Sequence, residues 1–297
     1  MSATLLGFYD SFKKKSLKDN AVIPVLFINT VICSLIFLPL IVLSATGTLP
    51  SSCPFHVGGG GWEMHRYVIL KSVIVLSSWL AGYIGMKHLP LTIVGPINAT
   101  RPVMVLIGAL LVYGERLNAW QWAGVAVAVA SFFLLSRSGK KEGINFAHDK
   151  WIGCIVLAAI LGAVSGLYDK YLMASPSDGG VGLDRMAVQS WYNIYQSAMM
   201  LMMLAIIWFP RRKADRFHWS WSIIGISIFL SAADFLYFYA LSLPSAMISI
   251  ISMVRRSSVL VSFLFGAIFF HERNLKGKAI DLSLVLLSMI LLFIGSK

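Results

Sequence analysis

The chain has 297 residues, of which 58% are hydrophobic and 13% are charged, and its mean hydropathy is +0.77. A soluble protein has about 25% charged residues, so most of this chain is expected to lie in lipid. The net charge of +12 comes from short segments between apolar runs rather than from one basic domain, which argues against a nucleic-acid partner. Three scattered cysteines give no spacing for a metal, and no cofactor is expected.

The apolar runs predict an all-α integral membrane protein with nine full spans and a partial first helix. Each full run has about 18–25 residues, which is enough to cross a hydrocarbon core of about 30 Å. The predicted spans are 21–44, 66–88, 91–113, 119–136, 151–173, 187–209, 219–242, 245–270 and 279–295. The segment 1–12 is too short to cross. We expect either a natural start upstream of Met1 or the loss of part of this helix.

The two halves of the chain repeat one another. The sequence Gly7-Phe8-Tyr9-Asp10 returns as Gly166-Leu167-Tyr168-Asp169. Later matches share a shift of 154 residues: Tyr83, Leu89-Pro90 and Arg101 return as Tyr237, Leu243-Pro244 and Arg255. Five spans per half place the second half in the opposite orientation, so the sequence predicts a ten-helix bundle of two inverted repeats, 1–138 and 151–297, joined by a linker over 139–150. Inverted repeats around a midplane site are typical of secondary transporters.

The distribution of basic residues predicts the orientation. With the span-end residues Lys87 and Arg66 included, segments after the odd-numbered helices carry 16 Lys and Arg residues, against 4 after the even-numbered helices and at the C-terminus. By the positive-inside rule, the odd-numbered loops are cytoplasmic and the C-terminus lies outside. We therefore expect a multi-pass protein of the inner (plasma) membrane.

Two similar helix endings carry a family resemblance. Gly114-Glu115-Arg116-Leu117 and His271-Glu272-Arg273-Asn274-Leu275 each precede a polar turn and a closing span. With the internal repeat, these endings resemble the EamA family of the drug/metabolite transporter superfamily. The resemblance implies a 5+5 bundle that moves small metabolites by alternating access, and it does not imply a substrate. Arginines inside the spans depart from the family pattern and look more like the phosphate-binding basic residues of sugar-phosphate transporters.

Arg101 and Arg255 are the strongest candidates for a substrate site. Each lies ten residues into its predicted span, about 15 Å deep and near the bilayer centre. A guanidinium at that depth normally faces the bundle interior or a water-filled cavity, where it can bind an anionic group bidentately. Arg256 and Tyr237 are further substrate-binding candidates. The alternative is a structural role, in which an arginine pairs with Asp234.

Three carboxylates are candidates for proton coupling or gating. Asp234 lies deep in its span, while Asp10 and Asp169 are expected near opposite mouths of the bundle. A simpler interpretation pairs Asp10 with Lys13 or Lys14, and Asp169 with Lys170. Lys71, predicted about one turn inside its span, is expected to snorkel to the interface.

Four prolines are candidate hinges. Pro90 and Pro244 join consecutive spans with almost no loop between them. Pro102 disfavours helical geometry at Arg101, and Pro96 predicts a second irregularity nearby.

The sequence thus predicts a secondary transporter of a small polar, anionic metabolite, surrounded by membrane lipids, as a monomer or a homodimer. A translocase for a lipid or a lipid-linked phosphate is the alternative. An intramembrane enzyme is disfavoured, because no His/Asp or His/Glu set comes together within the spans.

Overall fold

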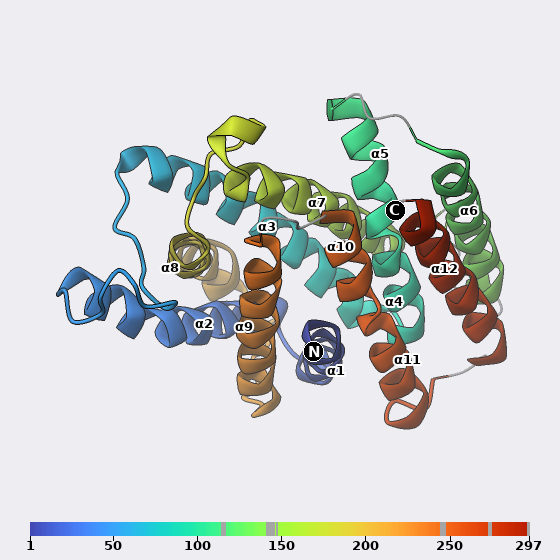
Figure 1. Ribbon diagram of the computed structural model, residues 1–297. Helices are drawn as coiled ribbons and strands as arrows, with labels where there is room; N and C mark the ends of the chain where they lie inside the picture. Colours follow the sequence, from blue (N-terminus) through green and yellow to red (C-terminus); the bar gives the residue numbers. More distant parts are fainter. Residues whose placement is uncertain (114–116, 141–145, 147, 244–247, 273–274, 296–297) are drawn as a thin grey trace.

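The structure is a computed structural model that describes residues 1–113, 117–140, 146, 148–243, 248–272 and 275–295. Glu115, Arg116, Arg273 and the predicted hinge Pro244 lie outside the described residues. All regular elements in these ranges are helical (Figure 1). The α-helices are α1 (Ser2–Leu17), α2 (Val22–Ala45), α3 (Trp62–His88), α4 (Leu91–Ala99), α5 (Arg101–Tyr113), α6 (Ala119–Lys140), α7 (Lys150–Met173), α8 (Arg185–Met203), α9 (Ser222–Leu241), α10 (Ile248–Arg256), α11 (Ser258–Ile268) and α12 (Leu275–Gly295). Three single turns, η1 (Pro176–Asp178), η2 (Leu204–Trp208) and η3 (Phe209–Arg211), complete the described elements.

The predicted spans are confirmed. Nine helical segments in the described part of the chain are long and apolar enough to cross a membrane, and they match the nine predicted runs within a few residues. The chain is therefore an all-α, multi-pass membrane protein.

The first helix is longer than the sequence predicts. α1 continues to Leu17, so Lys13, Lys14 and Lys15 lie in the helix and not in a loop after residue 12. A contact with another helix stabilises this extension: the Lys14 ammonium donates to the carbonyls of Met86 (2.8 Å) and Leu89 (2.5 Å) at the C-terminus of α3. A helix C-terminus presents unpaired carbonyls and partial negative charge, which suit a lysine.

Two of the crossing segments are broken. α4 ends at Ala99 and α5 begins at Arg101, so the backbone changes course at Thr100, directly before Arg101-Pro102. Pro102 lies in the first turn of α5, a position that suits proline because the N–H that it lacks has no partner within the helix there. α4 continues through Pro96, so the irregularity predicted there is absent. In the second half, α10 ends at Arg256 and α11 begins at Ser258, close to the repeat-related position.

Helix packing follows the internal repeat. The repeat relates α1 to α7, α2 to α8, α3 to α9, α4 and α5 to α10 and α11, and α6 to α12. Exchanging these partners maps one set of packing pairs onto another: α3 packs on α7 as α9 packs on α1, and α2 packs on α9 as α8 packs on α3. The helices α6 and α12, which are each other's partners, lie side by side at one end of the molecule (Figure 1). The two halves therefore enclose one shared interior.

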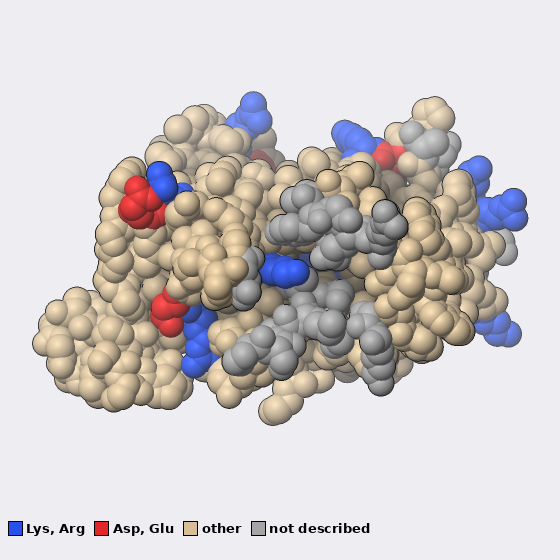
Figure 2. All heavy atoms as spheres, turned by 45° about the horizontal axis from the view of Figure 1, so that its top comes forward, with Lys and Arg blue, Asp and Glu red and all other residues tan. Residues whose placement is uncertain are grey.

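The interior is unusually polar and the outside apolar, as a lipid environment requires. Asn29, Ser72, Asn193 and Gln196 are almost completely buried, whereas many large apolar side chains are exposed. Figure 2 shows one face covered mostly by uncharged residues, with most of the charged side chains near its edges. Close packing uses small residues: a Cβ at Gly85 of α3 would lie 2.5 Å from Ile155 of α7, so only glycine permits this approach.

The joint between α3 and α4 is held by the second half of the chain. The Glu272 carboxylate accepts hydrogen bonds from the backbone N–H groups of Leu91 (2.6 Å) and Thr92 (2.8 Å) and from the Thr92 hydroxyl. These bonds cap the N-terminus of α4, where a carboxylate is favourable. Pro90, the N-cap residue of α4, lies at this joint.

Candidate functional site

A cavity of about 140 Å³ lies between the two halves. Residues of α1, α3, α4 and α5 line it from the first half, and residues of α7, α8, α9, α10 and α11 from the second. Its charged lining consists of Lys13, Lys71, Arg101, Arg255 and Arg256, with Asp10, Asp169 and Asp234. Five basic and three acidic side chains give the cavity an excess of two positive charges.

Two buried ion pairs neutralise part of this charge. Lys71 of α3 pairs with Asp169 of α7, and their side chains are only 3% and 6% exposed. Arg255 of α10 pairs with Asp234 of α9, with side chains 13% and 9% exposed. A charge this far from water needs a partner of opposite sign, because desolvation costs several kcal/mol per ion.

Two tyrosines connect the ion pairs into one network. Tyr237 donates its hydroxyl hydrogen to Asp169 (3.2 Å), and Tyr192 donates to Asp234 (2.7 Å). The guanidinium of Arg255 lies 4.3 Å from the Tyr237 ring centroid, and the Lys71 ammonium lies 5.2 Å from that of Tyr192. Each cation therefore lies near the tyrosine that donates to the other pair's carboxylate. The network ties α3, α7, α8, α9 and α10 together on one side of the cavity.

Arg101 lies at the break between α4 and α5 without a carboxylate partner in the described part of the chain. Its guanidinium Nη2 donates to the Asn98 side-chain oxygen (3.0 Å), and its buried Nε–H has no partner there. The guanidinium lies against α7 at Gly162, where a Cβ would be 2.6 Å from Cζ of Arg101. The absence of a side chain at Gly162 therefore makes room for the Arg101 charge.

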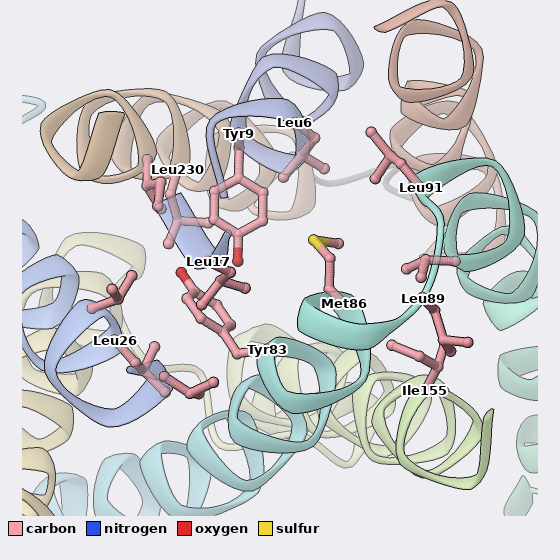
Figure 3. Close-up of a cluster of buried hydrophobic side chains, with 14 of the residues drawn as sticks. Leu6, Tyr9, Leu17, Leu26, Tyr83, Met86, Leu89, Leu91, Ile155 and Leu230 are labelled. Atoms are coloured by element: carbon pink, nitrogen blue, oxygen red, sulfur yellow. The ribbon is translucent and has the colours of Figure 1, made fainter. Parts of the chain in front are cut away.

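Two further basic residues of the cavity, Lys13 and Arg256, form no salt bridge among the described residues. The Lys13 ammonium lies 4.1 Å from the ring centroid of Tyr83 and 3.5 Å from the Tyr9 hydroxyl. Figure 3 shows the hydroxyls of Tyr9 and Tyr83 directed toward one another, between α1 and α3. Arg256 has a buried Nε–H that no described group accepts, and it lies within electrostatic range of Arg101, Arg255 and Asp10.

Asp10 is the one cavity carboxylate outside the two ion pairs. The Ser262 hydroxyl of α11 donates to it (3.3 Å), and Lys13, Arg256 and Arg101 are the charged groups that act on it. Asp10 thus faces the three basic residues that lack a salt bridge. In the absence of a ligand, it supplies part of the negative charge that they require.

Comparisons with known proteins agree with this architecture. The model of the EamA-like transporter family matches residues 1–137. Residues 1–137 are therefore similar to the EamA-like transporter family.

Two known proteins are similar to this chain. An uncharacterized transporter in the cobO 3′ region of a Sinorhizobium species is 32% identical over 95 residues, or 32% of this chain. The chain spans 64% of the length of that relative. A solved crystal structure superposes with a TM-score of 0.64 at 13% identity, covering 99% of this chain and 98% of the other. At this identity, the likeness shows the fold alone.

The structure brings the predicted site residues together. Arg101, Arg255, Arg256, Tyr237 and the three candidate carboxylates all line one cavity. Asp10 and Asp169, which were expected near opposite mouths, are therefore on the same cavity. Their binding, gating and proton-coupling roles stay predictions.

The structure corrects the prediction for Lys71. Lys71 does not snorkel, because α3 begins at Trp62, four residues earlier than predicted, so that Lys71 lies about 13 Å along the helix. Asp169 forms an ion pair with Lys71, a partner that the sequence did not suggest.

Sequence reasoning missed four residues of the site. Lys13 follows Asp10 by one helical turn, a spacing that would have suggested a shared face had α1 been extended to Leu17. Asn98 precedes Arg101 by three residues. Tyr192 and Gly162 had no signal in a single sequence, because their roles depend on contacts between distant helices.

Proposed function

We propose that this protein is a secondary transporter that carries a small anionic solute across a membrane by alternating access. The observation that carries the proposal is the shared cavity, in which Arg101, Arg256 and Lys13 face a single carboxylate, Asp10. Ionised side chains inside a membrane normally mark the path of a substrate or ion. Guanidinium groups offer several N–H donors in a planar fork that suits carboxylate and phosphate oxygens.

The broken helices support alternating access. Both breaks, at Thr100 and Ser257, lie beside cavity arginines, and they come from the two halves of the chain. Discontinuous helices next to a central site are a common feature of transporters, where unpaired backbone groups and substrate share a cavity. The halves are proposed to rock against one another around Arg101 and Arg255, with Pro90 at one of the joints.

Proton coupling is part of the proposal, and Asp10 is the carboxylate to test first. Asp169 and Asp234 each lie in an ion pair, so a proton on either carboxylate would remove a salt bridge. Adding a proton to Asp10 breaks no salt bridge among the described residues. It would also remove the negative charge that competes with a bound anion.

The test is solute uptake into reconstituted vesicles. Small carboxylated or phosphorylated solutes should enter protein-containing vesicles faster than protein-free ones, and neutral solutes of the same size should not. Uptake of neutral or cationic solutes, with no uptake of any anion, would contradict the proposal.

The orientation gives a separate prediction. A reporter that is active only outside the membrane should work when fused after Lys297, and a reporter that needs the cytoplasm should work near Arg212. Placing three lysines in α1 lowers the charge of the first loop, but the basic excess after the other odd-numbered helices remains. The reverse activity pattern would invert the topology and leave the transporter proposal untouched.

A further inference from the structure

The cavity points to the charge and size of the solute. We infer that the preferred substrate is a compact dianion, a molecule of about six to eight non-hydrogen atoms with two negative charges. The inference rests on the proposed function and narrows it to a substrate class. The two negative charges come from two carboxylates or from one phosphate monoester group.

The first step is the charge that remains after the ion pairs are set aside. Lys71 with Asp169 and Arg255 with Asp234 are internally neutral. Among the described lining residues, Lys13, Arg101 and Arg256 remain with Asp10, and with Asp10 ionised they leave an excess of two positive charges. An uncompensated charge in a low-dielectric interior is costly, so the bound state is most stable when the ligand brings two negative charges.

The second step is the supply of donors. Arg101 and Arg256 each hold a buried Nε–H with no acceptor among the described groups. A buried donor without an acceptor costs free energy, and an oxyanion offers several lone pairs to satisfy it. Lys13 adds three N–H donors from α1, on the opposite half of the chain from Arg256. Three basic side chains from three helices thus line the same cavity as Asp10.

The third step is volume. The cavity measures about 140 Å³. A protein cavity of about 150 Å³ accommodates a benzene molecule, with its six non-hydrogen atoms. A molecule the size of a three- or four-carbon dicarboxylate, or of a methyl phosphate, is therefore of the right size, whereas a nucleotide or a phospholipid head group with its glycerol is too large.

The experiment compares solutes that differ in charge and little in size. Succinate, its monoamide succinamate and its diamide succinamide share a four-carbon skeleton and carry two, one and no negative charges at pH 8. Methyl phosphate and dimethyl phosphate, with two charges and one, form the phosphate arm. Binding to the purified full-length protein is measured by calorimetry, and uptake is measured in vesicles.

We expect one dianion to bind about tenfold to a hundredfold more tightly than the monoanion of its own series, because an additional charged hydrogen bond is formed. The series that shows this ratio identifies carboxylate or phosphate as the source of the charge. Arg256→Gln leaves an excess of only one positive charge, so the ratio should fall toward one. Arg256→Lys keeps the charge and should keep most of the ratio.

Two results would overturn the inference in distinguishable ways. Equal binding of dianion and monoanion in both series, with neutral succinamide excluded, would reject the dianion and leave anion transport standing. Failure of all four anions to bind would overturn the inference and the proposed function together. An unchanged ratio in Arg256→Gln would show that Arg256 does not set the charge preference and would also reject the inference.

Discussion

Asp169→Asn should lower the free energy of unfolding by about 3–5 kcal/mol, because it leaves the Lys71 ammonium buried without a counter-charge. Asparagine keeps the shape of the side chain, and its oxygen can still accept the Tyr237 hydroxyl. The loss therefore reports the missing charge and not a cavity. Equilibrium unfolding in lipid–detergent micelles, followed by circular dichroism, measures it.

The paired control is Glu63→Gln. Glu63 forms a salt bridge with Arg66 at the start of α3, and both side chains are more than half exposed. An exposed pair contributes about 0–1 kcal/mol, so this variant should unfold almost like the native protein. An Asp169→Asn variant as stable as Glu63→Gln would show that Lys71 has access to water.

A double variant separates the charge from the contacts. Lys71→Met with Asp169→Asn removes both charges while keeping most of the volume, and such replacements are often neutral in stability. The double variant should therefore be more stable than Asp169→Asn alone. Lys71→Met is measured alone as well. If the loss of stability in the double variant equals the sum of the losses in Lys71→Met and Asp169→Asn, the two residues do not interact, and the ion pair is contradicted.

Hydropathy and the internal repeat are local or periodic signals, and they predicted the nine spans and the related halves. They also placed Arg101 and Arg255 at equivalent depths, because depth follows from helix rise and span length. The partners of these residues are set by packing between helices that are distant in the chain. Lys71 and Asp169 are 98 residues apart, and no pattern in one sequence links them.

The predictions from sequence that proved wrong concern mainly helix ends, where hydropathy is weakest. The first helix was predicted to end at residue 12, so Lys13 was assigned to a loop and was not considered a site residue. Beginning the third helix at residue 66 placed Lys71 too near the interface. Both predictions assumed that a lysine must reach water. In the structure, Lys14 donates to carbonyls of α3, Lys13 lies over the ring of Tyr83, and Lys71 pairs with Asp169.

Arg255 also shows what symmetry leaves undecided. Arg101 and Arg255 occupy equivalent positions in the repeat, so from sequence alone either could pair with Asp234. Arg255 takes this partner, since α9 and α10 pack against each other, and Arg101 contacts Asn98 and α7. Of the two repeat-related arginines, only Arg255 is neutralised by a described carboxylate. Arg101 is therefore the better candidate for binding an anion.

Arg101→Gln should weaken the binding of an anionic substrate by about tenfold to a hundredfold, because a charged hydrogen bond contributes about 1.5–3 kcal/mol. The change is measured as the dissociation constant of the anion by calorimetry and as KM for its uptake. A neutral analogue should bind both proteins alike. Arg101→Lys keeps the charge but not the planar fork, so its loss should be smaller.

Gly162→Ala provides an independent test that leaves Arg101 in place. The new Cβ would lie 2.6 Å from Cζ of Arg101, so the guanidinium must move away from α7. Alanine is favoured over glycine inside a helix by about 1 kcal/mol, so stability should not fall, while anion affinity should fall in the same direction as in Arg101→Gln. Gly153→Ala, on the same helix with open space around the new Cβ, is the control and should bind as the native protein does. Normal anion transport by both Arg101→Gln and Gly162→Ala would remove Arg101 from the site. If Arg256→Gln were also without effect, the anion hypothesis would have to be abandoned.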